Sequence, residues 1–211
     1  MGNEWQRSPI YIQGVDMSYK VNEIFYSVQA EGLFAGHPAV FVRLCGCNLQ
    51  CPWCDTKYHN QGEFYTKEEL EKAVMDLCPD KDNVIVVFTG GEPTLQLKDD
   101  EELLVGYRRH IETNGTRPVP KWIDYITCSP KFDLDVEKTI GRLPNEIKVV
   151  CEEGREEYLE SLIPLLKRGV RLYLQPLELD GSMNIDKTMD FILSHPQYKL
   201  SLQFHKIIGV R

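Results

Sequence analysis

Residues 39–56 read Ala39-Val40-Phe41-Val42-Arg43-Leu44-Cys45-Gly46-Cys47-Asn48-Leu49-Gln50-Cys51-Pro52-Trp53-Cys54-Asp55-Thr56. The first six of these residues are apolar except for Arg43 and predict a buried β-strand. Three cysteines follow directly in a C-x3-C-x2-C spacing, formed by Cys47, Cys51 and Cys54. Three thiolates from one loop can bind three irons of a [4Fe–4S] cube and leave the fourth iron open for chemistry.

Two other kinds of cysteine site fit the sequence less well. A structural zinc site needs a closed tetrahedral ligand set, and the chain has no second C-x2-C pair and no H-x3-H pair. Disulfides are not expected, because the seven cysteines are an odd number and no charged and apolar signal segment begins the chain. This favours a reducing, cytoplasmic location. Cys45, Cys78, Cys128 and Cys151 stand beside apolar residues and are predicted to be small buried side chains.

Length and composition predict one domain. With 211 residues and 42% hydrophobic residues, the chain can bury one substantial core. Residues 1–16 are polar and lack periodicity, so we interpret them as a tag or flexible extension before a single catalytic domain at 17–211. The net charge of −8 argues against a broad nucleic-acid surface. No apolar run approaches the roughly 18 residues of a membrane span, so neither nucleic acid nor membrane is an expected partner.

Strand-like and helix-like segments alternate along the rest of the chain. The predicted strands are Asn22–Gln29, Ala39–Leu44, Asn83–Thr89, Arg109–Glu112, Trp122–Thr127, Glu146–Val150, Arg171–Leu174 and Leu200–His205. The predicted helices are one capped by Thr66, a short acidic one at Asp99–Tyr107, and two at Arg155–Lys167 and Ile185–Leu193. The alternation predicts an α/β fold with a mostly parallel sheet, open or curled into a partial barrel. About six parallel strands are too few for a closed eight-stranded barrel.

Polar clusters stand at the ends of the predicted strands. They are the cysteine loop, Thr89-Gly90-Gly91-Glu92, Thr113-Asn114-Gly115, Ser129-Pro130-Lys131 and Gln175-Pro176. Each cluster alone could be an ordinary turn, since Gly, Asn, Pro and Ser favour turns. In parallel α/β folds, however, functional groups gather at the carboxyl ends of the strands. Five clusters at one edge therefore favour a functional site.

With these motifs in view, the chain resembles the radical S-adenosylmethionine (SAM) superfamily, whose signature is C-x3-C-x2-C followed by a G-G-E-P strand end. Within that superfamily it is most similar to the 7-carboxy-7-deazaguanine synthases. The matching segments are Glu23–Gly32, Phe41–Cys47, Trp53–Thr56, Thr89–Pro93, Glu112–Thr116, Ser129–Lys131, Leu174–Pro176 and Gln203–Lys206. They run in the family's order from about residue 21 to the end of the chain.

The resemblance implies a cluster site and a SAM site. Cys47, Cys51 and Cys54 are the implied ligands of a [4Fe–4S] cluster whose open iron is chelated by SAM. Gly91 is expected near the SAM amino group, because it has no side chain. The implied SAM-contacting residues are Trp53, Cys54, Asp55, Gly91, Glu92, Ser129, Pro130, Lys131, Gln175, Pro176, Leu177 and Glu178.

The resemblance also implies 6-carboxy-5,6,7,8-tetrahydropterin as the substrate. The implied substrate contacts are Val28, Gln29, Ala30, Glu31, Arg43, Thr89, His205 and the terminal carboxylate of Arg211. Arg43 suits the substrate carboxylate, because a guanidinium binds carboxylates through two parallel hydrogen bonds. Thr56 matches a Mg²⁺ ligand, a role that suits an oxygen atom. The residues alone leave two alternatives open: Arg43 could pair with a structural acid, and His205 could be a buried histidine without a catalytic role.

The implied reaction is a radical ring contraction that releases ammonia and forms 7-carboxy-7-deazaguanine, on the route to queuosine. It implies an external one-electron reductant such as a flavodoxin, and the family suggests a homodimer. One alternative is a radical SAM activase that forms a glycyl radical on a partner protein, which would not need Gln29–Gly32 or the His205 tail. A second is a non-catalytic metal-binding or tRNA-associated module, which the acidic charge and the five clusters disfavour.

The sequence departs from the family pattern at two places. The family usually has Gly where Ala30 stands, so a left-handed backbone there would be strained by the methyl group. Asp99–Tyr107 is short for a helix that connects two parallel strands, which predicts a truncated barrel.

Overall fold

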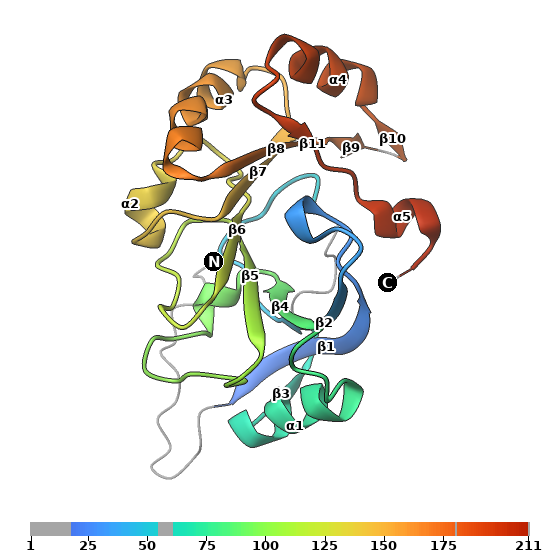
Figure 1. Ribbon diagram of the computed structural model, residues 1–211, viewed down its shortest axis with the longest axis vertical. Coiled ribbons are helices and arrows are strands. Elements are labelled where there is room, and N and C mark those ends of the chain that lie inside the picture. The colour runs from blue at the N-terminus through green and yellow to red at the C-terminus, as the bar shows by residue number, and fades with distance from the viewer. Residues whose placement is uncertain (1–17, 55–60, 180, 211) are drawn as a thin grey trace, which may run out of the picture.

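The computed structural model describes residues 18–54, 61–179 and 181–210, and the predicted extension at 1–16 lies outside them. The described chain forms a nine-stranded sheet in the order β11-β8-β7-β6-β5-β4-β2-β1-β3 (Figure 1). A separate two-stranded hairpin joins β9 (Glu178–Leu179) to β10 (Ser182–Met183). The order of the large sheet is linear, so within the described residues β11 and β3 remain edges and the barrel is partial.

Seven strands of the described sheet run parallel to one another. They are β2 (Pro38–Leu44), β4 (Ile85–Gly90), β5 (Arg108–Thr113), β6 (Tyr125–Cys128), β7 (Glu146–Cys151), β8 (Arg171–Pro176) and β11 (Lys199–Leu200). β1 (Tyr19–Val28) is antiparallel to both β2 and β3 (Glu63–Tyr65). The predicted class, an α/β fold with a mostly parallel sheet, is confirmed.

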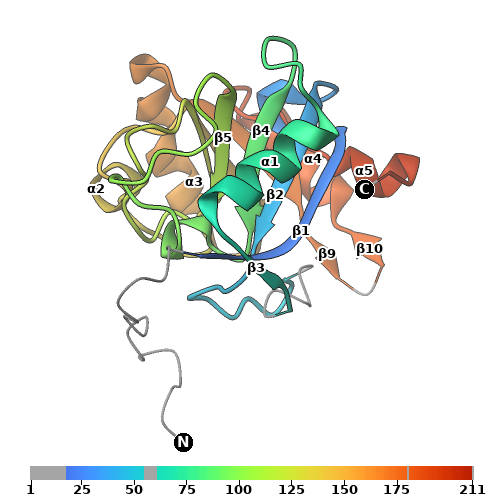
Figure 2. The same ribbon diagram turned by 90° about the horizontal axis from the view of Figure 1, so that it is seen from below.

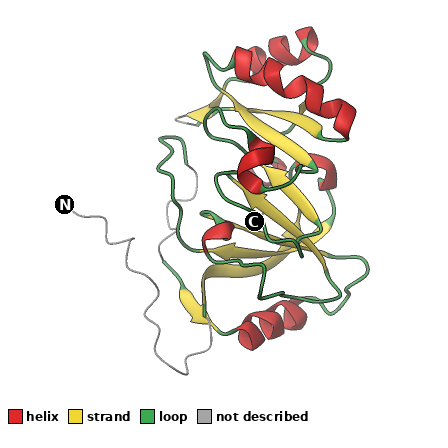
Figure 3. Cartoon of the chain, turned by 90° about the vertical axis from the view of Figure 1, so that its left-hand side faces the viewer, coloured by secondary structure: helices red, strands yellow, loops and turns green. Residues whose placement is uncertain are grey.

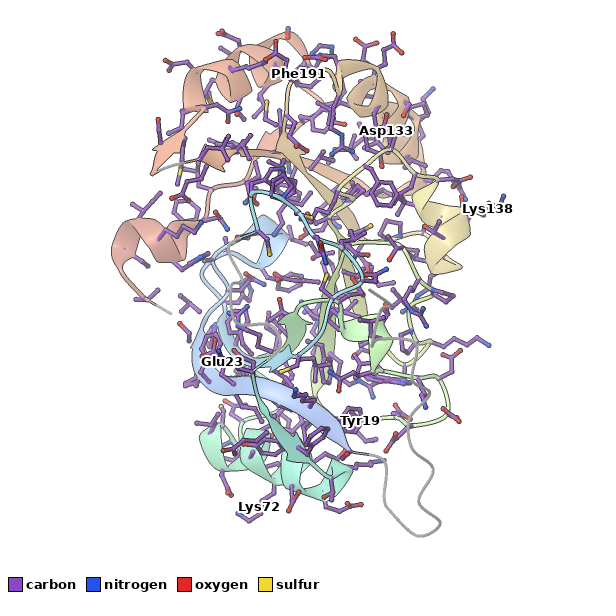
Figure 4. All side chains as sticks on the ribbon, turned by 180° about the vertical axis from the view of Figure 1, so that it is seen from behind. Tyr19, Glu23, Lys72, Asp133, Lys138 and Phe191 are labelled. Carbon is purple, nitrogen blue, oxygen red and sulfur yellow. The ribbon has the colours of Figure 1, made fainter. Side chains whose placement is uncertain are left out.

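The helices lie at both ends of the curved sheet. They are α1 (Lys67–Leu77), α2 (Val136–Ile140), α3 (Glu156–Leu162), α4 (Ile185–Ser194) and α5 (Phe204–Ile208), with 3-10 turns at Gly32–Phe34, Pro93–Leu95 and Ile163–Arg168. Helices α3 and α4 cover one end, and α1 covers the other (Figures 1 and 3). Phe191 on α4 and Lys72 on α1 mark these two ends in Figure 4. Every helix of the described chain is too short or too polar to cross a bilayer.

Helix α1 begins where the sequence predicts. The Thr66 hydroxyl accepts a hydrogen bond from the Glu69 backbone N–H at 3.2 Å, and the Glu69 carboxylate accepts one from the Thr66 N–H at 2.8 Å. This reciprocal pair satisfies two donors at the helix start. Leu70 and Val74 are fully buried, and α1 lies in front of β2 and β4 in Figure 2.

The alternating side chains of the strands form two separate cores. In β2, Val40, Val42 and Leu44 belong to the large core between sheet and helices. Ala39 and Phe41 point to the opposite face and join a smaller cluster inside the curve of the sheet. Because successive side chains of a strand alternate between faces, Arg43 continues the inner row. The inner face is thus apolar at its base and polar toward the carboxyl ends of the strands.

The predicted strand Leu200–His205 is wrong beyond its first residue. Its alternating pattern is real, but β11 pairs with β8 only through Lys199 and Leu200, and the Ser201 N–H makes the last bond to the Leu174 carbonyl at 2.9 Å. The chain then leaves the sheet edge and forms α5. Alternation cannot produce a strand where no neighbouring strand accepts its hydrogen bonds.

The predicted helix at Asp99–Tyr107 is also wrong. The segment forms turns, and Leu104 has a left-handed backbone with φ of 53°. Leu103 and Leu104 are both buried in the large core, and the Leu104 N–H donates to the Glu71 carboxylate at 2.7 Å. Both leucines enter the core through this turn, and their packing outweighs the weak helix propensity of the segment.

The remaining predicted elements differ from the structure mainly at their boundaries. β6 begins at Tyr125, three residues after the predicted start, and the helix predicted at Arg155–Lys167 is α3 followed by a 3-10 turn that ends at Gly169, whose φ is 88°. β3, α2 and the β9–β10 hairpin were not predicted. Each has only two to five residues, too few for a periodicity to be read.

Candidate active site

A cavity of about 1010 Å³ opens at the carboxyl ends of the parallel strands. Most residues predicted for the site line it. They are Val28, Gln29, Ala30, Glu31, Arg43, Cys47, Cys51, Trp53, Cys54, Thr89, Gly91, Ser129, Lys131, Gln175, Pro176, Leu177, Glu178 and His205. The structure therefore brings residues from nearly the whole length of the described chain into the lining of one cavity.

Three predicted site residues, Asp55, Thr56 and Arg211, lie outside the described residues. Two others, Pro130 and Glu92, do not line the cavity. Pro130 is not part of the lining, and its carbonyl accepts a hydrogen bond from Arg155 at 3.3 Å. Glu92 is 0% exposed and also lies behind the wall.

The carboxylate of Glu92 joins the ends of β4 and β5. It accepts hydrogen bonds from the Thr94 N–H and hydroxyl at 3.1 and 2.6 Å, from the Thr113 hydroxyl at 2.8 Å and from the Asn114 N–H at 2.7 Å. Four donors satisfy a buried carboxylate, which is otherwise costly to bury. Glu92 thus supports the wall from behind, and its side chain makes no contact with the cavity.

The cysteine loop is held against these strand ends by backbone and amide contacts. The Gly91 N–H donates to the Leu44 carbonyl at 3.1 Å, and the Glu92 N–H donates to the Gly46 carbonyl at 2.8 Å. A Cβ on Gly91 would lie 1.9 Å from the Gly46 oxygen, so only glycine permits this approach. The Asn114 side chain also donates to the Asn48 side chain at 3.0 Å.

The three thiols of the loop line the same cavity, although within the described residues no group of three His, Cys, Asp or Glu side chains lies close enough together to hold a metal ion. Burial raises the pKa of Cys47 and of Cys51. The hydrogen bond from the Leu49 N–H at 3.4 Å acts to lower the pKa of Cys47, and the charge of the Lys131 ammonium acts to lower that of Cys51. A bound iron centre would favour the thiolate form that burial disfavours. The donor set, three sulfurs on one loop facing open volume, fits a [4Fe–4S] cluster with one open iron.

Cys45 has a different environment, as predicted. It is 4% exposed, and its thiol donates to the Gln61 carbonyl at 3.1 Å. A Cβ on Gly62 would lie 2.5 Å from this sulfur. Cys45 therefore packs behind the loop and away from the cavity.

Trp53 and Lys131 form the wall beside the thiols. The Trp53 indole N–H donates to the Glu152 carboxylate at 2.8 Å, and the Lys131 ammonium lies over the indole ring, 5.0 Å from its centre. Lys131 also donates to the Ser129 hydroxyl at 2.9 Å. A cation over an aromatic face is stabilised by the ring's negative face, so the two side chains fix each other's position.

Arg43 has an acidic partner inside the cavity. Its Nε donates to the Glu23 carboxylate at 2.8 Å, and its guanidinium lies 5.8 Å from the Phe25 ring centre. Glu23, labelled in Figure 4, is on β1. The pairing with an acid is thus present, but both partners line the cavity. Among the described residues, Glu23 alone forms an ion pair with Arg43, and it does so through Nε and not through the Nη atoms.

The turn after β1 is tightly bonded. The Gln29 backbone N–H donates to the His37 carbonyl at 2.8 Å, and its carbonyl accepts from the Gly36 N–H at 2.7 Å. Gln29 therefore faces the cavity through its side chain, because both of its backbone groups are used in the turn. Ala30 is not among the residues with positive φ, so the methyl group at this position causes no strain.

The sequence reasoning missed three polar residues on the inner face. Glu112, Thr127 and Lys148 line the cavity from β5, β6 and β7. Each follows an inward-facing residue of its strand by two positions: Tyr125 of the inner cluster, His110, whose ring stacks on Tyr125, and Glu146, which accepts a hydrogen bond from the Tyr125 hydroxyl. A polar residue at a buried strand position indicates a cavity or a polar network, since burial without partners is costly.

Glu112 on β5 lines the floor of the cavity, by which we mean the part formed by the inner face of the sheet. It accepts hydrogen bonds from the Thr89 hydroxyl at 2.9 Å and from the Gln29 amide at 3.1 Å. Burial acts to raise the pKa of Glu112, but the Lys148 ammonium, these two donors and Arg43 outweigh it and hold the pKa below its ordinary value. The floor therefore presents an ionised carboxylate at neutral pH.

Helix α5 and the β9 strand face each other across the rim of the cavity. Lys206 on α5 donates to the Glu178 carboxylate at 2.7 Å, and both side chains are about 30% exposed. His205, next to Lys206, lines the cavity. The C-terminal segment thus contributes side chains to the site although it is not a strand.

Comparisons with known proteins agree with this geometry. Residues 42–129 match the sequence model described as Radical SAM superfamily. A 7-carboxy-7-deazaguanine synthase from Bacteroides thetaiotaomicron is 42% identical over 198 residues, covering 92% of this chain and 100% of the relative. One from Haemophilus influenzae is 38% identical over 210 residues, covering 92% of this chain and 94% of the relative.

A solved structure shows the same fold. The crystal structure of QueE from Escherichia coli has a TM-score of 0.64 and 28% sequence identity, covering 88% of this chain and 94% of that chain. The motif match, the sequence similarity and the fold all indicate the same family. The chain belongs to the 7-carboxy-7-deazaguanine synthase family of the radical SAM superfamily.

Proposed function

We propose that this enzyme catalyses the radical ring contraction of 6-carboxy-5,6,7,8-tetrahydropterin to 7-carboxy-7-deazaguanine, with loss of ammonia, on the 7-deazapurine route to queuosine. The relatives bear the product's name, and the similarity extends over nearly all of their length. The observation that carries the proposal is the composition of one cavity, which is lined by three thiols of the loop together with Arg43 and Glu112.

Membership of the radical SAM superfamily implies a [4Fe–4S] cluster and SAM. Cys47, Cys51 and Cys54 would hold the cluster, and Gly91 would lie against SAM. When bound, these groups supply a 5′-deoxyadenosyl radical that takes a hydrogen atom from C6 of the pterin. A Mg²⁺ ion at Thr56 remains a prediction from the family resemblance.

The side chains of the floor would orient the pterin. The Nη side of Arg43 suits the substrate carboxylate, because charge-assisted bidentate hydrogen bonds fix both position and angle. The ionised Glu112 suits N–H donors on the edge of the flat ring. His205 on α5 would face the substrate from the rim of the cavity.

Two partners and a location belong to the same proposal. Hydrogen abstraction by a radical from SAM needs an external one-electron donor such as a flavodoxin. Ile207 and Ile208 on α5 are each 59% exposed, and such apolar exposure supports the expected homodimer. A cytoplasmic location agrees with reduced cysteines, and none of the seven, all of which lie among the described residues, forms a disulfide.

The test is a reconstitution under strictly anaerobic conditions. The full-length protein is loaded with iron and sulfide and incubated with SAM, dithionite, Mg²⁺ and the carboxypterin. Mass spectrometry then measures 5′-deoxyadenosine and the deazapurine, and we expect both to accumulate. The control is Cys51→Ala, which should form neither.

The two products separate the parts of the proposal. If SAM is cleaved but no deazapurine forms, the substrate assignment is wrong while the radical SAM chemistry stands. If neither product forms in protein that contains the cluster, the proposed activity is wrong.

A further inference from the structure

Lys148 occupies an unusual position on the inner face of β7. Its ammonium forms an ion pair with Glu31, in the turn after β1, and the two side chains are only 9% and 12% exposed. In the order of the sheet, four strands separate β7 from β1. The ion pair therefore spans the hollow of the partial barrel and joins two walls that no hydrogen-bonded strand pair connects.

Gln29 connects Glu31 of this ion pair to Glu112 through hydrogen bonds. The Glu31 N–H donates to the Gln29 side-chain oxygen at 3.1 Å, and the Gln29 amide nitrogen donates to Glu112 at 3.1 Å. Glu112 and Lys148 line the same cavity from β5 and β7, and the Lys148 charge lowers the pKa of Glu112. The amide of Gln29 thus has a single satisfactory orientation, because its oxygen meets a donor and its nitrogen meets an acceptor.

Glu146, two residues before Lys148, anchors the next part of the same turn. Its carboxylate accepts hydrogen bonds from the Leu33 N–H at 3.1 Å, the Tyr125 hydroxyl at 3.0 Å and the Thr127 hydroxyl at 2.9 Å. A Cβ on Gly32 would lie 2.2 Å from this carboxylate. β7 therefore fixes the turn at two successive inward positions.

We propose that Lys148 is a positioning residue of the active site, which holds Glu31 and the turn after β1 in place and keeps the Glu112 carboxylate charged and oriented toward the substrate. The proposal rests on the proposed function for the identity of the substrate. Lys148 acts through Glu31, Gln29 and Glu112.

The charges around Glu112 make the direction of the effect predictable. Lys148 on β7 and Arg43 on β2 favour its ionised form, while burial opposes it. Glu31, which forms the ion pair with Lys148, and Glu146 act to raise the pKa of Lys148, so its side chain stays charged. His110, on the same strand as Glu112, is buried and neutral near pH 7, as its pKa of about 4 indicates. Removing the ammonium therefore raises the pKa of Glu112, and removing Glu31 does not.

The experiment measures the titration of Glu112 directly. The full-length protein is labelled with ¹³C at the glutamate carboxyl carbon, and the Glu112 resonance is assigned with E112Q. In K148M its midpoint is expected to move up by at least about one pH unit. K148R keeps the charge and is expected to restore the wild-type midpoint, and E31Q is expected not to raise it. K72M removes a lysine from a surface ion pair on α1 and serves as the matched control.

Steady-state kinetics of the reconstituted enzyme provide the second measurement. K148M is expected to raise the KM for the carboxypterin about tenfold or more, while the cluster absorbance stays at the wild-type level. An unchanged Glu112 midpoint in K148M, or a failure of K148R to restore it, overturns the proposal. These titrations are measured without substrate, so they remain decisive if the wild-type enzyme forms no deazapurine.

A second variant covers a possible folding defect of K148M, which leaves Glu31 buried without its partner. K148M/E31Q removes both partners and leaves no unpaired charge at this position. The Glu112 midpoint is expected to rise in this double variant also. A wild-type midpoint there overturns the proposal in the same way.

Discussion

At the scale of single residues, the four cysteines of residues 45–54 differ in what surrounds each sulfur. Cys47, Cys51 and Cys54 line the cavity. The Cys45 thiol donates to the Gln61 carbonyl and is surrounded by protein. Burial raises the pKa of Cys45, of Cys47 and of Cys51 alike, so position and not acidity separates Cys45 from the other cysteines. A thiol enclosed by protein and turned away from the cavity serves as a small core side chain.

This contrast predicts opposite effects of two alanine substitutions. Cys45→Ala should retain the iron–sulfur absorbance of the reconstituted protein and lower its stability by about 1 kcal/mol, the cost of one lost hydrogen bond. Cys51→Ala should lose the absorbance. Absorption spectra and iron content measure both effects, and Cys78→Ala is the control for loss of a buried cysteine elsewhere. An equal loss of iron in Cys45→Ala and Cys51→Ala would contradict this ligand set.

At the scale of elements, several parallel strands each place a polar inward-facing residue in the lining of the cavity. Arg43, Thr89, Glu112 and Lys148 do so from β2, β4, β5 and β7. These strands were predictable because most of their outward-facing residues are apolar, as Val40, Val42 and Leu44 are in β2. The segment Leu200–His205 has an equally good alternation and is mostly not a strand, since a strand also needs a partner with free hydrogen-bonding groups.

The Thr66 cap at the start of helix α1 can be tested by its contribution to the stability of the protein. Thr66→Ala removes the hydroxyl that accepts the Glu69 N–H, and should destabilise the protein by about 1 kcal/mol. For a chain of this size that corresponds to a fall in Tm of about 2–4 °C. Thermal denaturation measures it. Thr139→Ala, which loses a hydroxyl that donates to carbonyls of its own helix α2, should change Tm by less, and an equal fall would show that the cap has no special role.

At the scale of the whole molecule, the curve of the sheet creates an enclosed aromatic base beneath the cavity. The His110 ring stacks on Tyr125 with centroids 4.8 Å apart and meets the edge of Phe34 at 4.5 Å. His110 is 4% exposed, and its buried Nε2 has no hydrogen-bond partner in the described structure. Burial, with a smaller effect from Arg108, lowers the pKa of His110 from 6.5 to about 4.

This lowered pKa predicts a pH-dependent stability. Between about pH 6.5 and pH 4 the unfolded chain binds a proton at His110 that the folded protein excludes, so stability falls as the pH falls through that window. Above pH 6.5 the contribution is complete, and the loss amounts to roughly 3 kcal/mol by pH 4.

His110→Phe should remove this part of the pH dependence while keeping the aromatic packing. Urea denaturation at pH 7.5, 5.5 and 4.5 measures it for the wild type and the variant. His195→Gln, at the end of α4, is the control and should keep the wild-type slope. Parallel pH curves for the wild type and His110→Phe would contradict the prediction.

The sequence by itself determined the class of the fold, the cysteine loop and the edge of the sheet where polar groups gather, because these features depend on short-range spacing and periodicity. The buried role of Cys45 and the Thr66 cap are local in the same sense. Only the tertiary structure decided which polar residues share the floor of the cavity. Glu31 and Lys148 are 117 residues apart and meet across the barrel, and Glu92 supports the wall from behind instead of lining it. Such contacts depend on the curvature of the whole sheet, which no local pattern contains. The spacing of the three cysteines thus predicted a site from the sequence, and only the fold showed that Glu112 and Lys148 line the same cavity.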